Sequence, residues 1–339
     1  MASCLTSIEI PVEINGGRLV VSGQISTLQD QSFITLGITS DSTASVSKPL
    51  SGASIFLFDD KGNSFVYVET TWGTYTLIGA GGKVGHTYHI EIELPNGKRY
   101  KSIPEKMPEA SVLDSVSYEV ATEKVIDFEG LATLKAFYKI YANSTSIIKN
   151  SYLKWNVTED YLLTPTYFPP PPNVPPYPAP PNCYIAQRVD AQRISLFDWT
   201  KSSSNTLKKQ LIATREIDWT FLEKHYFTTY QTSLTKEAYE YWRKTNILAN
   251  QVGSIFDTPP AELKGNLESV GNPAEKTWGY FQVVNQTSAR RAFYKFDLPF
   301  PLLAKTCEFT GSYDRSLYET RCLECLTIRN SSYTRPSWF

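Results

Sequence analysis

Apolar and polar residues alternate with a period of two from Arg18 to about Ser102, a pattern typical of β-strands. Turn signals separate the alternating runs, and Pro95-Asn96-Gly97 is a clear hairpin signal. Roughly seven short strands at this spacing predict an immunoglobulin-like or transthyretin-like sandwich over residues 18–103. The runs that carry the alternation are residues 19–21, 33–38, 54–58, 65–69, 73–77 and 87–94.

A short Pro-Glu-Lys-Met-Pro segment at residues 104–108 is predicted to be a linker. Period-two alternation resumes after it, most clearly around Phe137 and Tyr141 and again in residues 226–230. Residues 109–339 are therefore predicted to form a larger β-rich domain, either a sandwich or a barrel. The predicted fold class is mainly β, with an immunoglobulin-like sandwich followed by this larger domain.

Residues 235–252 carry the one convincing helical pattern. Thr235 is a good N-cap, and Glu237 lies in the first turn, where the helix dipole favours a negative charge. A lone amphipathic helix in a β-rich chain is expected to lie across a sheet or close one end of it, and a partner-binding helix is the alternative. We expect it to cover a sheet of the larger domain, with Tyr239 and Trp242 as structural residues and Trp242 buried. Its apolar face comprises Ala238, Tyr241, Trp242, Thr245, Leu248 and Ala249.

A proline-rich arm occupies residues 165–181 and is followed by Cys183. Proline fixes φ and lacks a backbone donor, so this stretch is predicted to be extended polyproline II rather than a strand. One interpretation is a recognition arm in which Tyr167, Phe168 and Tyr177 contact a partner. The alternative is a rigid surface loop inserted between two strands.

Five cysteines divide into one near the N-terminus, Cys4, and four others. An even set of four in a β-rich chain predicts two disulfides and an oxidising compartment. The sequence leaves the pairing open, although a Cys322–Cys325 bond would close a strained ring. Zinc bound by the four cysteines is the alternative, but only one C-x-x-C pair is present, so no metal is predicted. The four are Cys183, Cys307, Cys322 and Cys325.

The formal net charge of −1 gives no basic footprint for nucleic acid. Aromatic residues make up 13% of the chain, which favours β structure. Of the three histidines, His86 and His89 fall on opposite faces of a strand and cannot form a chelate. Because neither a G-x-S-x-G nor an H-E-x-x-H motif occurs, no catalytic residue and no cofactor are predicted. A carboxylate pair could still serve a hydrolase, which remains an alternative.

Several short blocks resemble the bacterial lipoprotein family called domain of unknown function 4249. They are Leu234-Thr235 with Glu237-Ala238-Tyr239 and Tyr241-Trp242, Ile255-Phe256-Asp257 with Pro259-Pro260, Gly265-Asn266, Gly279-Tyr280-Phe281, and the C-terminal C-x-x-C. The resemblance implies a cell-surface protein of the outer membrane that faces the exterior. Genes of this family commonly lie beside genes of TonB-dependent transporters, which implies an outer-membrane β-barrel as partner.

The first residues, Met1-Ala2-Ser3-Cys4, resemble the end of a lipoprotein signal. The resemblance therefore implies lipidation at Cys4, with residues 1–17 as the tether and the lipid as the only membrane attachment. Together these features predict a non-catalytic accessory or binding subunit of an outer-membrane barrel complex. An adhesion or structural surface module is the alternative that the sandwich alone would favour.

Overall fold

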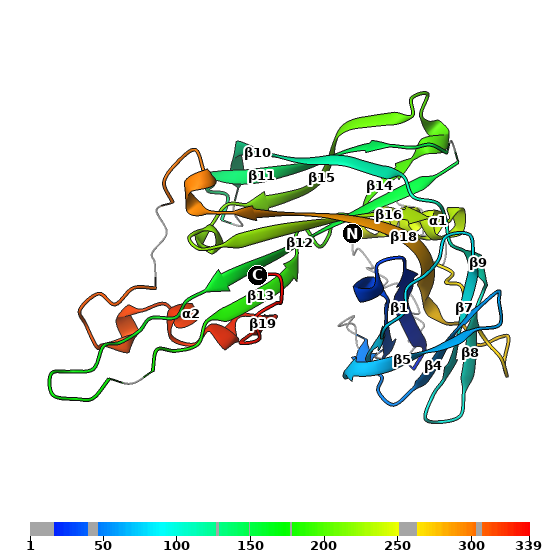
Figure 1. The fold of residues 1–339 in the computed structure, drawn as a ribbon, viewed down its shortest axis with the longest axis horizontal. Helices are drawn as coiled ribbons and strands as arrows, with labels where there is room; N and C mark the ends of the chain where they lie inside the picture. Colours follow the sequence, from blue (N-terminus) through cyan, green and yellow to red (C-terminus); the bar gives the residue numbers. More distant parts are fainter. Residues whose placement is uncertain are drawn as a thin grey trace, which may run out of the picture. The chain divides into compact units, whose positions relative to one another are not determined.

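The structure is a computed structural model that describes residues 17–39, 47–126, 129–148, 150–176, 178–250, 263–302 and 307–339. It is mainly β with one main helix, as the alternation predicted (Figure 1). The chain divides into two compact units. The first comprises Met1–Glu109 and Leu234–Asn285, and the second comprises Ala110–Ser233 and Gln286–Phe339.

The first unit is built on one sheet with the order β17-β8-β7-β4-β5-β6-β2-β1-β18. Neighbouring strands are mostly antiparallel, but β1 runs parallel to β18, with Val20 opposite Trp278. Alternate residues of these strands form its core, where Ile34, Ile55 and Ile90 are fully buried. The strands are β1 (Leu19–Ser26), β2 (Phe33–Ile38), β3 (Lys48–Pro49), β4 (Ser54–Asp59), β5 (Ser64–Thr71), β6 (Thr74–Leu77), β7 (Thr87–Glu93), β8 (Arg99–Ser102), β9 (Glu105–Lys106), β17 (Leu267–Ser269) and the first part of β18 (Trp278–Phe293).

The second unit has two layers of strands. A three-stranded sheet, β10-β11-β15, faces a sheet with the order β18-β16-β12-β13-β19, on which β14 also pairs with β12 (Figure 1). Ile140, Trp155 and Phe227, from three different strands, meet in its core. The strands are β10 (Val112–Ile126), β11 (Ala132–Thr145), β12 (Tyr152–Leu163), β13 (Cys183–Arg188), β14 (Ser195–Asp198), β15 (Thr206–Glu216), β16 (His225–Leu234) and β19 (Ser331–Ser332), with the short helix α2 (Thr320–Leu323) near the C-terminus.

The division between the units differs from the predicted boundary. A break at residues 104–108 was expected and the chain does leave the first unit there, but residues 234–285 return to it instead of staying in a domain over residues 109–339. Helix α1 (Lys236–Asn250) therefore belongs to the first unit. The physical reason is the parallel pairing of β1 with β18, a contact between distant parts of the sequence that no local pattern reveals.

Motif residues that are far apart in the sequence converge on one buried carboxylate, Glu105, which is 7% exposed. Thr235 Oγ1 donates to Glu105 Oε2 at 2.7 Å, and the Tyr280 hydroxyl donates to Glu105 Oε1. Asn266 Nδ2 also lies 3.3 Å from Glu105 Oε1. Burial raises the pKa of Glu105, and the nearby charge of Glu237 adds to this. The converging residues therefore hold the start of α1 against β9 and β18.

Two glycines allow β18 to approach its neighbours closely. Gly279 has φ +93°, and a Cβ there would lie 1.8 Å from the Val21 carbonyl oxygen. A Cβ on Gly265 would lie 1.9 Å from the Gly279 carbonyl oxygen. Only glycine fits such contacts without moving the backbone, so the glycines of the motif are explained by strand packing.

The two structural aromatics of α1 have different surroundings. Tyr239 is buried, at 6% exposed, as expected for a packing residue. Trp242 is only half-buried, and it lies in the first unit rather than under a sheet of the larger domain. Its indole Nε1 donates to Gln282 Oε1 at 2.8 Å. The expected burial of Trp242 is therefore not found, because the indole reaches a polar partner at the margin of the core.

Replacing Trp242 with phenylalanine should lower the free energy of unfolding by about 1–2 kcal/mol, because Gln282, itself buried, loses a hydrogen-bond donor. Urea unfolding of the variant measures the loss. Lys244→Ala, at an exposed position of the same helix, is the matched control and should change stability by less than about 0.5 kcal/mol. A loss at Trp242 no larger than that of the control would contradict the assigned hydrogen bond.

Candidate partner-binding site

The proline arm leaves the second unit at the end of β12 and returns at the start of β13 (Figure 1). Immediately before the arm, Thr164 donates from its amide and its hydroxyl to the two carboxylate oxygens of Glu223, at 3.1 and 2.8 Å. Two residues later, the Thr166 amide donates to the Cys322 carbonyl at 2.8 Å. Hydrogen bonds from Thr164 and Thr166, on either side of Pro165, thus fix the outgoing leg of the arm.

An aromatic cluster holds the next part of the arm. The ring of Phe168 lies edge-on to Phe309 and Tyr318, with centroid distances of 5.8 and 4.9 Å, and the Arg315 guanidinium lies 5.5 Å from its centre. The Tyr313 hydroxyl donates to the Pro169 carbonyl at 2.7 Å. Phe168 therefore packs within the chain, and half-buried Tyr167 precedes it. Of the three expected anchors, Phe168 already has intramolecular partners and Tyr177 lies outside the described residues.

Beyond this base the arm projects. The Val174 amide donates to the Pro171 carbonyl at 3.1 Å, which closes a turn, and Asn173 has φ +71°, a conformation that asparagine tolerates. Residues 171–176 are exposed throughout, including 49% of the Val174 side chain. In the neighbouring loop Tyr313 is 50% and Leu317 65% exposed. The arm and this loop together present an exposed apolar surface, which we call the arm surface.

Two disulfides tie the arm surface to the unit, and the prediction of two disulfides is confirmed. Cys183, at the end of the arm, bonds to Cys325, and Cys307 bonds to Cys322. The side chains of Cys183 and Cys325 are buried with Tyr161 and Ile185 in a small hydrophobic cluster that is separate from the main core of the second unit. The four cysteines are thus paired in disulfides rather than gathered around a metal ion. Cys4, the predicted lipidation site, lies outside the described residues.

A small cleft of about 310 Å³ opens at the base of the arm. Its walls include Trp219, Glu223 and Arg321. The Arg321 guanidinium lies 4.2 Å from the centre of the Trp219 ring, and its Nε donates to Glu319 at 2.6 Å. Glu223 and Arg321 are already bound to other groups of the chain, so these two side chains brace the base of the arm.

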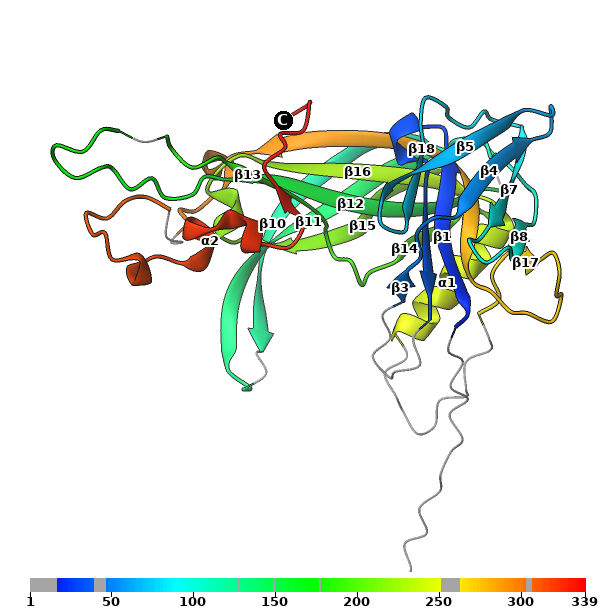
Figure 2. The ribbon, with the colours of Figure 1, turned by 90° about the horizontal axis from the view of Figure 1, so that it is seen from below.

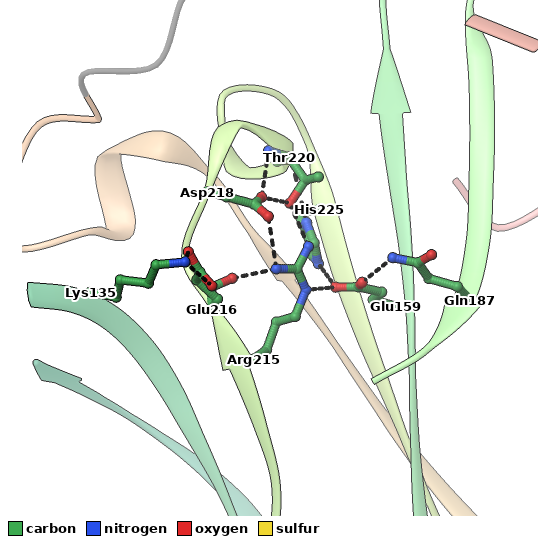
Figure 3. A network of polar contacts seen from close by, with 8 residues as sticks. All are labelled: Lys135, Glu159, Gln187, Arg215, Glu216, Asp218, Thr220 and His225. Atoms are coloured by element: carbon green, nitrogen blue, oxygen red, sulfur yellow. Dashed lines mark hydrogen bonds and ion pairs between the residues drawn. The ribbon is translucent and has the colours of Figure 1, made fainter. Parts of the chain in front are cut away.

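A second candidate is a buried polar network in the second unit (Figure 3). Glu159 on β12 accepts from Arg215 Nε of β15 at 2.6 Å, from Gln187 of β13 at 2.6 Å, and lies 3.1 Å from His225 Nε2 of β16. The same arginine bonds to Asp218 at 3.0 Å and to Thr220 at 3.1 Å. One carboxylate thus ties four strands together.

The surroundings of His225 show what this network can do. His225 is 0% and Glu159 1% exposed, and the Phe221 ring is stacked on the imidazole at 4.0 Å. Burial raises the pKa of Glu159, but the His225 hydrogen bond and the Arg215 charge outweigh burial and leave it below its usual value. A histidine and a carboxylate without access to solvent cannot reach a substrate, so the network stabilises the fold.

This network was not predicted from the sequence. The signal was present, because β12 buries alternate residues and Glu159 falls on that buried side between Val157 and Tyr161. A carboxylate in an apolar row implies a cationic partner. The sequence does not show which cationic side chain pairs with Glu159, because Arg215 lies on a strand more than 50 residues away.

The other histidines have local partners. His86 Nδ1 lies 3.1 Å from Asp60 Oδ1, and His89 is stacked on Phe58 at 5.2 Å. Within the described ranges, no group of three or more His, Cys, Asp or Glu side chains is arranged to hold a metal ion. None of the helices described is long and apolar enough to cross a membrane.

Comparison with known families gives one match. The family described as Domain of unknown function (DUF4249) matches residues 6–290, which is most of the chain. The match covers the motif residues around Glu105, the buried network and the whole proline arm. No curated protein matches the chain.

Proposed function

The chain belongs to the DUF4249 family, whose description assigns no function, and from its geometry we propose that it is a non-catalytic binding subunit that contacts another protein through the arm surface. The observation that supports the proposal most is the fixing of a proline-rich arm at both legs while its turn stays exposed.

The energetics of the arm suit a contact surface. Proline has little conformational entropy to lose on binding, so a partner can bind the arm without ordering it first. Hydrogen bonds at Thr164 and Pro169 and the disulfide at Cys183 already fix its position. The exposed apolar side chains of Val174 in the arm and Leu317 in the neighbouring loop would gain from being covered.

The class of partner and the location belong to the same proposal. The partner is an outer-membrane β-barrel protein, and the chain is held at the outer surface of that membrane by a lipid on Cys4. This follows the family resemblance of the motif residues and of the small residues before Cys4. A chain anchored beside a barrel needs a stiff projection to reach it, and the arm provides one.

Replacing Pro171 to Pro176 by glycine and serine residues, at unchanged length, tests the role of the arm. The variant should keep its melting temperature within about 2 °C, because the replaced residues bury little surface. It should recover much less of a barrel partner when the tagged chain is purified from detergent-solubilised membranes of cells that express it.

The matched control is Val66→Ser, which changes an exposed residue of β5 in the first unit. It should leave recovery of the barrel unchanged. If the arm variant recovers the barrel as well as the control does, the arm is only a structural strap and the proposed contact is wrong.

A further inference from the structure

Strand β10 is the open edge of the three-stranded sheet in the second unit. Among the described residues it pairs only with β11, and it does so over 15 residues with a single irregularity, between Leu113 and Ser115. An open edge presents a row of unpaired backbone donors and acceptors, which a further strand can satisfy.

The other sheet ends in the described ranges are blocked. Strand β17 with three residues and β19 with two end the other sheet path, and both are too short to extend it. At the opposite edge of the three-stranded sheet, β15 has two irregularities in its pairing, and Lys209 there has φ +53°. Bulges protect an edge from pairing, so β10 is the exception.

At the C-terminal end of β10, the described part of the sheet consists of only β10 and β11. Residues 122–126 pair with residues 132–136 of β11, but β15 begins to pair with β11 only at Phe137. The two strands therefore extend beyond the sheet as a ribbon, which Figure 2 shows. Ile126 is 67% and Leu134 77% exposed on this ribbon. Two-stranded ribbons are marginally stable alone, so added strands would stabilise it.

The two glutamates on the outward face of β10 do not prevent another strand from pairing with this edge. Glu119 and Glu123 face outward, but each is bound to a lysine of the same sheet, Lys209 at 2.8 Å and Lys139 at 2.6 Å. The inward residues Val116, Tyr118 and Val120 pack on the core and are half-buried. β10 is rich in β-branched residues and carries Asp114, Glu119, Glu123 and Lys124, so a strand that pairs with it must keep its own carboxylates away from Glu119 and Glu123.

We propose that β10 pairs antiparallel with β10 of a second copy of the chain, centred on Val120. In this register Ala121 lies opposite Glu119 of the other copy and Ser117 opposite Glu123, so no two carboxylates are directly opposite. Residues 122–126 of each ribbon lie opposite residues 114–118 of the other copy, which its three-stranded sheet supports. Each copy therefore stabilises the weak part of the other, and this reciprocity favours a second copy over an unrelated strand.

Cysteine cross-linking tests the register in the full chain with Cys4 replaced by serine. Ser117→Cys combined with Glu123→Cys should give a disulfide-linked dimer on mild oxidation, because opposite residues have Cα atoms about 4.5–5.5 Å apart. Within one strand the two positions are roughly 20 Å apart, so they cannot bond to each other. Ser117→Cys combined with Ala121→Cys, which is out of register, should give no disulfide-linked dimer.

Sedimentation measures the affinity without cross-linking. A single strand pair is a small interface, so we expect a dissociation constant on the order of micromolar for the unmodified chain. Ala121→Glu would place one carboxylate opposite Glu119 of the other copy, which happens twice in each dimer, and should weaken dimerisation on the order of fivefold, whereas Ala121→Gln should not.

A chain that stays monomeric up to about 1 mM overturns the proposal, as that limit corresponds to negligible affinity. A dimer that cross-links equally in the out-of-register pair, or that is indifferent to Ala121→Glu, also overturns it, since such a dimer forms elsewhere. These experiments use the purified chain alone, so their outcome is independent of the barrel partner.

Discussion

Glu159→Gln should lower the free energy of unfolding of the second unit by about 3–5 kcal/mol. Glutamine keeps the size of the side chain but removes the charge, so the buried Arg215 keeps only Asp218 as a counter-charge and His225 faces a neutral amide. Losing one partner of a buried ion pair costs more than the intact pair contributes to stability. Chemical denaturation followed by circular dichroism measures the change.

Glu216→Gln is the matched control, because Glu216 lies at the margin of the same network and binds Lys135 at 2.9 Å. Both side chains of that pair are about 40% exposed, at 39% and 40%, so its loss should cost less than about 1 kcal/mol. Equal losses in the two variants would show that Glu159 does not act as a buried counter-charge.

The same carboxylate should make stability depend on pH. The pKa of Glu159 is lower in the folded chain than its unfolded value of 4.5. A carboxylate with a lowered folded pKa stabilises the fold above the unfolded pKa, and this contribution is lost as pH falls through the folded pKa. The stability of the unmodified chain should therefore fall more steeply below pH 4.5 than that of Glu159→Gln.

Removing the Cys183–Cys325 bond by replacing both residues with alanine should cost roughly 4–5 kcal/mol in the chain-entropy model, because it closes a long loop. The two cysteines are 142 residues apart in sequence, whereas Cys307 and Cys322 are 15 apart. The shorter loop should contribute roughly 3 kcal/mol, so Cys307→Ala with Cys322→Ala is the matched control.

Thermal denaturation of both double variants separates the two contributions. The longer bond should show the larger drop in melting temperature, and it should also release the return leg of the arm, which limited proteolysis would detect as new cleavage before β13. If the two double variants are equally stable, loop length does not govern the effect and the stabilisation must come from local packing of the sulfur atoms.

Local features of the fold could be predicted from the sequence. The N-cap is one example, because the Ala238 amide donates to Thr235 Oγ1 at 3.1 Å, as the position of a threonine before an apolar helical face indicated. The alternation at residues 87–94 likewise became β7, with its even positions buried. Both depend on neighbours in sequence, which is why a pattern of a few residues sufficed.

Features that depend on distant partners could not be predicted. Phe168 was expected to be free for a partner, yet it packs on Phe309 and Tyr318, more than 140 residues later. The disulfide prediction held for the same cysteines, but the pairing needed the structure, since all three pairings satisfied the count. An exposed aromatic and a packed one have the same sequence signature when the packing partner is remote.

The interrupted first unit has a consequence for the order of synthesis. Strand β1 ends at Ser26, but its parallel partner reaches Val284, so one side of β1 has no neighbour until the ribosome has added about 250 more residues. At bacterial and eukaryotic elongation rates this interval lasts on the order of 10–50 s. During that time β1 and the strands up to β8 can form only an incomplete sheet, in which one edge of β1 is unpaired. A chaperone that holds nascent chains should therefore bind between residues 19 and 38 and leave only after β18 has emerged.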